Sequence, residues 1–252
     1  THHIAGAMIL LRAAVAGTNP QVVDTTNGFH PRDLLPAIQG VTQDDMPGYL
    51  SLVPTQLVQC LDADEEVLEA LRSLSAILVG GAAISNHLLE RALNAGLKVR
   101  VTYGMTETAG GCVYDGEPMP GITVRAVDWD GRTRLAFNGP TLMTRYLDAD
   151  SPFFEEGGQR WMVSGDMGVI RASGKVEVSG RADDVIISGG LSIAPGPLRR
   201  ALRSYEGISD AWILGTPDEK WGQIVTALVV PHQMPSDSLE MAELGSAVRE
   251  HA

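Results

Sequence analysis

The sequence has few cysteines, few basic residues and no long apolar run, and each scarcity excludes a class of protein. Its two cysteines, Cys60 and Cys112, lie far apart without CxxC or Cys/His ligand spacing, so neither a disulfide framework nor a structural zinc site is expected. Nineteen Lys and Arg against 31 Asp and Glu leave a net charge of −12. Sequence-independent binding of nucleic acid is therefore not expected, because it needs clustered cations.

The longest apolar stretches are shorter than the roughly 18 residues of a membrane span, so none is predicted. The chain begins without the charged segment and cleavage site of a signal peptide. Together with the low cysteine content, these features predict a cytoplasmic protein.

Glycine, by contrast, is abundant, with 28 residues, and it recurs at the ends of predicted strands. Ala76–Val79 is an apolar strand that ends at Gly80-Gly81, Asn86–Ala95 is a predicted helix, and Leu97–Tyr103 is a second strand that ends at Gly104. This βαβ pattern predicts an α/β fold with a parallel sheet and ligands at the carboxyl ends of its strands. Glycine at a turn can also simply supply a positive φ.

The remaining chain predicts two further regions. Short alternating segments after Gly121 predict antiparallel β-structure, either a small barrel or a meander: Ile122–Val127, Thr133–Phe137, Trp161–Val163, Met167–Arg171 and Lys175–Val178. A small α+β domain should follow, with elements at Val185–Ile187, Pro197–Tyr205, Ala211–Gly215, Ile224–Val230 and Leu239–His251. We place the boundary between a large domain, residues 1–181, and this small one, residues 182–252. Upstream, Val22–Val23 is predicted as a short strand and Pro31–Ile38 as a helix.

The segment from Val101 to Thr108 holds the highest density of residues that could bind a ligand. A Tyr103 ring can cover a purine face, Gly104 gives access to the backbone, the Thr106 hydroxyl can bond a phosphate oxygen, and Glu107 can hold Mg²⁺. Thr and Glu after a strand can equally be a helix N-cap and a first-turn acid, so these residues alone leave both interpretations open.

Four motifs in order resemble those of the adenylate-forming superfamily, which includes acyl-CoA synthetases, luciferases and peptide-synthetase adenylation domains. They are YGxTE at Tyr103–Glu107, GPxxxxxY at Gly139–Tyr146, [ST]GDxG at Ser164–Gly168 and GRxDD at Gly180–Asp184. His3–Gly6 is similar to an earlier HxxG element and Gly80–Ala82 to the GGA loop beside adenine. Ser51–Leu57 and the run from Tyr103 to Gly116 most resemble the o-succinylbenzoate-CoA ligases of menaquinone biosynthesis.

The resemblance implies a role for each matching residue. Nucleotide would be bound by Gly80, Gly81, Ala82, Tyr103, Gly104, Met105, Thr106, Asp166 and Arg181, with Tyr103 on adenine and Asp166 on the ribose hydroxyls. Thr106, Glu107 and Arg181 would be catalytic, and Glu107 would hold Mg²⁺. His3, Ser51, Thr55, Gln56 and Thr108 would line the acyl pocket, Ser188, Gly189 and Gly190 the CoA tunnel, and Asp183 would be the hinge.

The implied function is an ATP-dependent ligase that forms an acyl-AMP from a carboxylic acid, with o-succinylbenzoate as the expected acid, and then a CoA thioester. A fatty- or aryl-acid ligase and a non-catalytic adenylate-binding protein stay open as alternatives, and a homodimer is compatible with the sequence. The superfamily's phosphate-binding loop is absent, and none of Lys98, Lys175 and Lys220 matches its catalytic lysine. We therefore expect a chain truncated at both ends that adenylates poorly.

Overall fold

The computed structural model describes residues 3–42, 47–147, 152–234, 242, 245 and 246. They form two compact units: Thr1–Thr123 with Asn138–Ser151, and Val124–Phe137 with Pro152–Ala252. The domain boundary predicted between residues 181 and 182 falls inside the second unit and stays a prediction.

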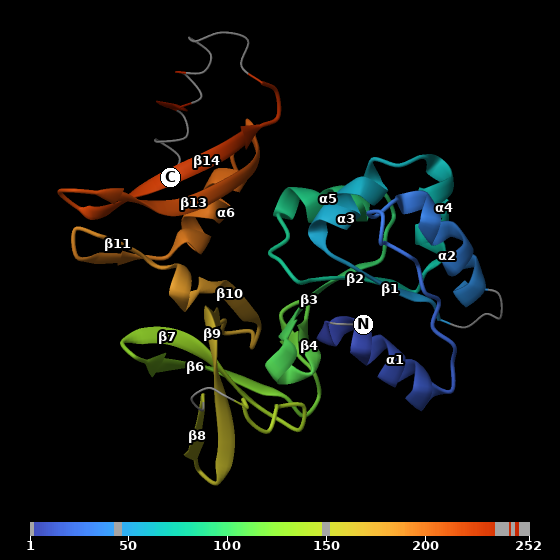
Figure 1. Cartoon of the computed structure of the whole chain (residues 1–252), viewed down its shortest axis with the longest axis horizontal. Helices are drawn as coiled ribbons and strands as arrows, with labels where there is room; N and C mark the ends of the chain where they lie inside the picture. Colours follow the sequence, from blue (N-terminus) through green and yellow to red (C-terminus); the bar gives the residue numbers. More distant parts are fainter. Residues whose placement is uncertain (1–2, 43–46, 148–151, 235–241, 243–244, 247–252) are drawn as a thin grey trace. The chain divides into compact units, whose positions relative to one another are not determined.

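The first unit is an α/β sheet with helices on both sides (Figure 1). Its elements are α1 (Ile4–Ala16), η1 (Pro31–Asp33), α2 (Leu34–Thr42), β1 (Tyr49–Leu52), α3 (Pro54–Leu61), α4 (Glu65–Ser73), β2 (Ala76–Val79), α5 (Asn86–Asn94), β3 (Val99–Met105), η2 (Thr106–Thr108), β4 (Gly110–Tyr114) and β5 (Glu117–Pro118). The sheet order is β1-β2-β3-β4-β5, with β1, β2 and β3 parallel and the last two strands antiparallel. The predicted βαβ unit is confirmed.

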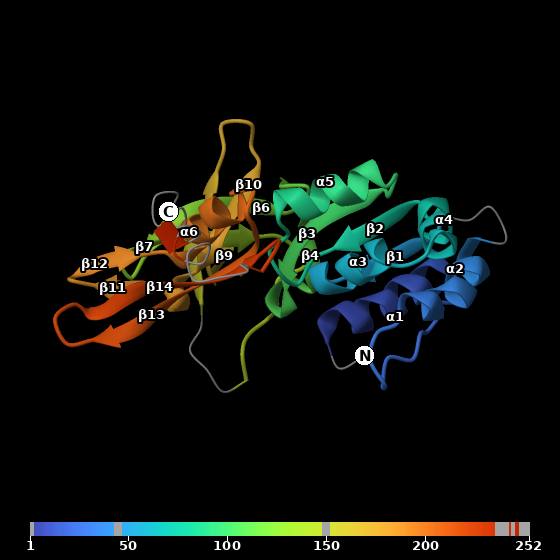
Figure 2. The same ribbon diagram turned by 90° about the horizontal axis from the view of Figure 1, so that it is seen from above.

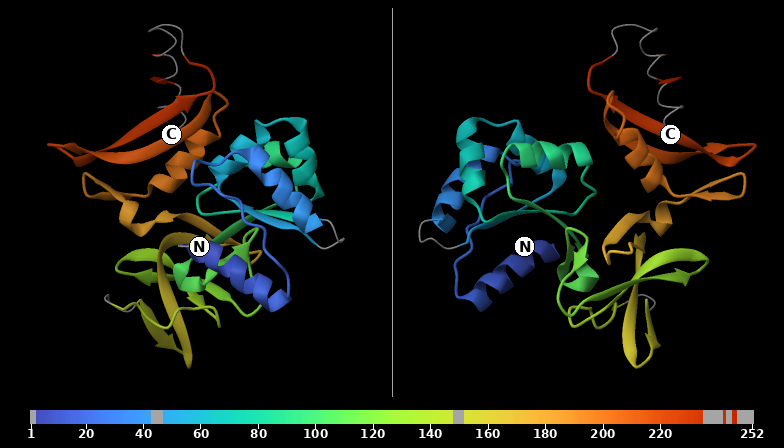
Figure 3. Two further views of the ribbon diagram at one scale, coloured as in Figure 1. Left: turned by 45° about the vertical axis from the view of Figure 1, so that its right-hand side comes forward. Right: turned by 180° about the vertical axis from the view of Figure 1, so that it is seen from behind.

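Local sequence signals explain where these helices begin. The Asp64 carboxylate accepts a hydrogen bond from the Val67 amide at 3.3 Å, and the Ser85 hydroxyl accepts one from the Leu88 amide at 3.1 Å, so both residues are N-caps. The helices α2 to α5 bury their apolar faces in one core with the parallel strands. Helix α1 lies on the other side of the sheet, with Ala13 as its buried residue (Figures 1 and 3).

The second unit contains two antiparallel sheets. Its elements are β6 (Thr123–Trp129), β7 (Arg132–Asn138), β8 (Phe153–Glu156), β9 (Gln159–Ile170), β10 (Val176–Arg181), η3 (Ala182–Asp184), β11 (Ile186–Ser188), β12 (Leu191–Ile193), α6 (Pro195–Arg203), β13 (Ile208–Asp218) and β14 (Gly222–Pro231). The first sheet has the order β10-β9-β7-β6, with β8 paired to β9. It is an open sheet over the described residues, so the predicted antiparallel structure is confirmed and the barrel is wrong. It is not a simple meander, because β8 follows β7 in the chain but pairs with β9.

The second sheet has the order β12-β11-β14-β13, and Figure 2 shows the β11–β12 hairpin beside the long β13–β14 pair. Helix α6 packs against it through Leu202, which shares a small core with Ile208, Ala211 and Ile213. This arrangement is the α+β unit predicted from the sequence. The predicted helix Leu239–His251 lies almost entirely outside the described residues.

Two local predictions are wrong. Val22–Val23 forms no strand, because this segment pairs with no other and Val22 is exposed. The two strands predicted at Trp161–Val163 and Met167–Arg171 are one continuous strand, β9, because its first half pairs with β7 and β8 and its second half with β7 and β10. Among the described residues, no helix is long and apolar enough to cross a membrane.

Candidate functional site

The ends of β2 and β3 bring the first two candidate segments together. The register pairs Val79 with Val101, which places Gly80 beside Thr102. A Cβ atom at Gly80 would lie 2.3 Å from the Thr102 hydroxyl oxygen and 2.7 Å from its carbonyl oxygen, so no other residue fits here. Gly81 has a φ of +79°, and both Gly81 and Ala82 are exposed. Their backbone is therefore open to a ligand at the carboxyl edge of the parallel strands.

Tyr103 and Gly104 lie within β3, which extends two residues beyond the predicted strand end at Tyr103. The extension follows from pairing with β4, whose register shifts between Tyr103 and Gly104. A Cβ atom at Gly104 would lie 2.0 Å from the Gly110 carbonyl oxygen, so the two strands can approach only because residue 104 is glycine. The half-buried Tyr103 therefore lies on the strand next to β2, which is followed by the exposed Gly81 and Ala82.

The turn after β3 carries Thr106, Glu107 and Thr108. Residues Thr106–Thr108 form a single 3-10 turn that ends at Ala109 in the left-handed region, with a φ of 55°. An α-helix does not follow, which disfavours the interpretation of Thr106 and Glu107 as an N-cap and a first-turn acid. Thr106 is exposed and Glu107 is half-buried, so both side chains can reach a ligand.

Thr108 has a different environment from its two neighbours. Its residue surface is only 1% exposed. Its hydroxyl oxygen accepts a hydrogen bond from the Met105 amide at 3.0 Å, and the hydroxyl donates to the Gly110 carbonyl at 2.8 Å. This arrangement favours a role in closing the turn, and the acyl-pocket role implied by the resemblance stays a prediction.

The segment of the GPxxxxxY motif contacts Glu107 twice. The Tyr146 hydroxyl donates a hydrogen bond to the Glu107 carboxylate at 2.5 Å, and the Met143 amide donates one to the Glu107 carbonyl at 2.8 Å. Sequence reasoning found the motif but gave Tyr146 no role, and it missed Met143 entirely. No local signal links these residues to Glu107, because Tyr146 is 39 residues away.

The predicted acyl-pocket residues lie near the end of β1, except His3 and Thr108. Ser51 and Thr55 are exposed, and Val53 between them would approach a Cβ atom at Gly81 within 3.4 Å. The Gln56 side-chain oxygen accepts a hydrogen bond from the Val53 amide at 3.0 Å and so stabilises the start of α3. His3 lies directly before α1 and is exposed.

In the second unit, the GDxG and GRxDD motifs face one another across adjacent strands. The register of β9 and β10 pairs Asp166 with Arg181 directly. The Arg181 guanidinium lies 3.8 Å from the Asp166 carboxylate and 3.2 Å from that of Asp183. The side chain of Asp166 is 16% exposed and that of Arg181 is 56% exposed, so the pair presents one carboxylate and one donor fork to a ligand.

Nearby groups support both charged side chains. The Asp166 amide donates a hydrogen bond to the buried Ser164 hydroxyl oxygen at 3.1 Å, and that hydroxyl donates to the Leu135 carbonyl at 2.9 Å. A Cβ atom at Gly165 would lie 2.8 Å from the Arg181 guanidinium, which explains the glycine before Asp166. The hydrogen bond to Asp183 raises the pKa of Arg181, and the Asp166 charge acts in the same direction.

The predicted hinge and CoA-tunnel residues occupy two turns. Asp183 is exposed on η3, between the two sheets of the second unit. Gly189 and Gly190 form the two-residue turn of the β11–β12 hairpin, with φ values of +56° and +83°. Positive φ at both positions is the geometry of a type I′ turn, which accounts for the two glycines without a ligand. Ser188 is half-buried, and the tunnel stays a prediction.

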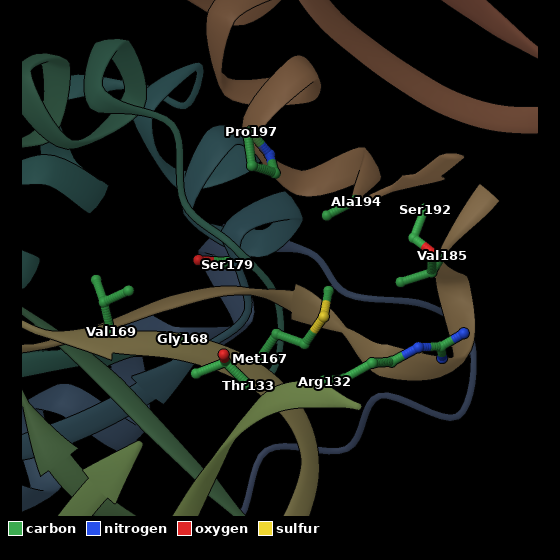
Figure 4. Close-up of a pocket in the computed structure, with 10 residues that line it drawn as sticks. All are labelled: Arg132, Thr133, Met167, Gly168, Val169, Ser179, Val185, Ser192, Ala194 and Pro197. Atoms are coloured by element: carbon green, nitrogen blue, oxygen red, sulfur yellow. The ribbon is translucent and has the colours of Figure 1, made fainter. Parts of the chain in front are cut away.

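A cavity of about 360 Å³ lies beside η3 in this unit (Figure 4). Strands β7, β9 and β10 line one side of it, and the segments from η3 to β11 and from β12 to α6 line the other. The lining residues are Arg132, Thr133, Met167, Gly168, Val169, Ser179, Val185, Ser192, Ala194 and Pro197. The candidate residues Asp166, Arg181 and Asp183 are not among them, so this cavity is separate from the Asp166–Arg181 pair.

The donor set around η2 fits a magnesium ion that a nucleotide helps to hold. The described residues contain no group of three or more His, Cys, Asp and Glu that could bind a metal by themselves. Mg²⁺ often needs only one or two carboxylates, since it keeps water and substrate phosphates as its other ligands. Glu107, with the exposed Thr106 hydroxyl beside it, offers hard oxygen donors of this kind.

The comparison with known proteins decides the family. Residues 1–147, more than half of the chain, match the family described as AMP-binding enzyme. The chain belongs to the AMP-binding enzyme family. This membership is consistent with the candidate residues Gly80–Ala82 and Tyr103–Glu107, which all lie in the matched part.

Two curated relatives are ligases. The chain is 37% identical over 244 residues to a probable 2-succinylbenzoate–CoA ligase of Mycobacterium tuberculosis, and the match covers 95% of this chain and 61% of the relative. It is 30% identical over 239 residues to a 2-succinylbenzoate–CoA ligase of Staphylococcus aureus, covering 88% of this chain and 46% of that relative. The chain thus spans about half to three fifths of their length.

Solved structures show the same fold. The chain resembles an o-succinylbenzoate CoA synthetase of Bacillus subtilis in complex with the acyl-adenylate intermediate, with a TM-score of 0.74, 26% identity, and coverage of 99% of this chain and 52% of that one. The same enzyme with ATP and magnesium ion gives a TM-score of 0.73 at 25% identity, over 99% and 53% of the two chains. The AMP-binding fold predicted from the motifs is confirmed.

Proposed function

We propose that this chain contributes to an ATP-dependent ligase that joins 2-succinylbenzoate to CoA through an acyl-AMP intermediate. One observation carries the proposal: the exposed backbone of Gly81 and Ala82 lies beside the strand that leads from Tyr103 to Glu107. The ends of β2 and β3 and the turn after β3 carry an aromatic ring, open backbone groups, a hydroxyl and a carboxylate, and nucleotides bind at the carboxyl edge of parallel strands in α/β proteins. The curated relatives named above support 2-succinylbenzoate as the acid.

In this proposal, the first unit binds the base and the phosphates. Tyr103 stacks on adenine, and the Gly80–Ala82 backbone borders the ring. The Thr106 hydroxyl donates to an α-phosphate oxygen, and Glu107 holds the metal. Mg²⁺, when bound, neutralises phosphate charge. In the second unit, Asp166 accepts hydrogen bonds from the ribose hydroxyls, and Arg181 donates to ribose or phosphate oxygens.

The chemistry needs positioning and charge compensation more than an activated side chain, because the substrate carboxylate is itself the nucleophile. A carboxylate oxygen attacks the α-phosphorus of ATP, the bond to the bridging oxygen breaks, and pyrophosphate leaves with that electron pair. The CoA thiolate then attacks the acyl carbon, and AMP leaves. Thr106 and Arg181 are the donors on this chain that would stabilise the charge developing on the phosphoryl oxygens.

The finer assignments belong to the same proposal. Asp183 is the proposed hinge, Ser188 with the two hairpin glycines borders the CoA thiol arm, and Ser51, Thr55 and His3 contact the acid. A homodimer and a cytoplasmic location stay predictions of the sequence.

ATP–pyrophosphate exchange by the complete gene product tests the proposal. Exchange should depend on 2-succinylbenzoate and should be much weaker with benzoate or a medium-chain fatty acid. Exchange with another acid alone would show a different ligase of the family. Absence of exchange with any acid, combined with calorimetric binding of AMP, would indicate an adenylate-binding protein without this activity.

A further inference from the structure

Tyr146 and Glu107 belong to different sequence motifs and contact each other. The proposed mechanism uses Glu107 but gives Tyr146 no role. The Tyr146 hydroxyl lies 2.5 Å from the Glu107 carboxylate oxygen. Distances of about 2.5–2.7 Å are typical of a hydroxyl that donates to an ionised acceptor, where the bond is about twice as strong as between neutral groups. The contact therefore fixes the end of the Glu107 side chain, which carries the oxygen atoms that could hold a metal.

The backbone that leads to Tyr146 is held at two points of the motif. Gly139 has a φ of +151°, and a Cβ atom there would lie 2.6 Å from the Ile122 side chain and 2.7 Å from the Gly121 carbonyl oxygen. Further along, the Met143 amide donates to the Glu107 carbonyl at 2.8 Å. Gly139 and Met143 thus fix the segment against the first unit close to Tyr146.

We propose that Tyr146 is a positioning residue that orients the Glu107 carboxylate for Mg²⁺ held with a nucleotide, a role that rests on the function proposed above. One carboxylate oxygen accepts the hydrogen bond from the phenol, and the other oxygen stays available to the metal. The Met143 amide donates to the Glu107 carbonyl, so Glu107 is held at its backbone as well as at its carboxylate. Carboxylates that bind metals are commonly held by such outer hydrogen bonds.

Tyr146 can be substituted with little effect on the core, because it is 37% exposed and lies outside the helices and strands. Its ring does not belong to the buried core, and Tyr146→Phe removes only the hydroxyl. Tyr49→Phe is the matched control, since Tyr49 is 63% exposed on β1, a strand that carries no proposed metal ligand.

The test measures binding of Mn²⁺, a paramagnetic substitute for Mg²⁺, to the complete gene product in the presence of ATP and without any acid substrate. Electron paramagnetic resonance counts free Mn²⁺, and the same titration without protein is subtracted to remove the Mn²⁺ that ATP binds by itself. We expect Tyr146→Phe to weaken Mn²⁺ binding by about 10–100-fold and Tyr49→Phe to leave it unchanged. Glu107→Gln, which removes the proposed ligand charge, should weaken it at least as much.

Metal-free AMP binding separates positioning from folding. Calorimetry in EDTA should give the same AMP affinity for the wild type, Tyr146→Phe and Tyr49→Phe, because the phenol acts on the metal ligand. Wild-type Mn²⁺ affinity in Tyr146→Phe, with a weakened Glu107→Gln, would overturn the role of Tyr146 and leave the proposed function standing. Equal losses of AMP and Mn²⁺ affinity in Tyr146→Phe would show a structural role instead. No binding of Mn²⁺ with ATP by the wild type would overturn both proposals.

Discussion

The buried hydroxyl of Thr108 offers a sharp test of how the turn after β3 is built. Thr108→Val keeps the shape of the side chain but removes the acceptor of the Met105 amide and the donor to the Gly110 carbonyl. Water cannot replace the hydroxyl, because the residue is 1% exposed. An unsatisfied buried group costs about 1–3 kcal/mol, so the two together should lower the free energy of unfolding by about 2–4 kcal/mol.

Thr108→Ser is the matched control. It retains the hydroxyl and removes one buried methyl group, which should cost about 1 kcal/mol. Valine is therefore expected to be the more damaging substitution, although it is the more hydrophobic residue. If Thr108 instead lined an open acyl pocket, its hydroxyl would be solvated, and both substitutions would change stability by only a few tenths of a kcal/mol.

Urea unfolding measures these differences with two probes that report on different units. Helices α1 to α5 lie in the first unit, so far-ultraviolet circular dichroism follows it. All four tryptophans, at positions 129, 161, 212 and 221, belong to the second unit, so their fluorescence is a reference. At a slope of about 2 kcal/mol per molar urea, the valine variant should shift the dichroism midpoint by about 1–2 M. An unshifted midpoint, or a serine variant as damaging as valine, would refute the reasoning.

Three further predictions concern the fold and the nucleotide. Gly104→Ala should separate β3 from β4, because its Cβ atom would lie 2.0 Å from the Gly110 carbonyl oxygen, and AMP binding measured by calorimetry should disappear. Asp166→Asn should weaken AMP binding by about 10–100-fold, the equivalent of about 1.5–3 kcal/mol for a charged hydrogen-bond acceptor, whereas unchanged affinity would argue against a ribose contact. Burial raises the pKa of Cys60 from 9.0 to about 11, so the unfolded chain loses this proton first. The free energy of unfolding should accordingly fall as pH rises from about 9 to about 11, and a flat profile over that range in urea titrations would contradict it.

The periodic parts of the fold were predictable because their signals are local. Ala76–Val79 is a short apolar run, Asn86–Ala95 has a serine N-cap before it, and glycine follows each strand. The structure confirms these elements almost residue for residue. The prediction at Val22–Val23 is wrong because two apolar residues are not enough for a strand without a partner, and a partner is a property of the tertiary structure.

In the candidate site, too, local signals predicted one part and the tertiary structure decided the other. The types of side chain a nucleotide needs were visible in order along the chain, from Gly80 to Arg181. Their local geometry was not, because it depends on the register between strands. A register shift in β4 places Gly104 against the Gly110 carbonyl, and one in β10 is followed by the pairing of Asp166 with Arg181.

By itself, the sequence determined the family, the βαβ arrangement and the chemical inventory of the site, since each of these is encoded in residue types and short spacings. Only the tertiary structure decided which groups meet. It turned the Thr108 hydroxyl inward to close its own turn and brought Tyr146 to Glu107 across 39 residues. The physical reason is that a hydrogen bond forms only within a few tenths of an ångström of its preferred length, and that separation is set by how distant segments pack.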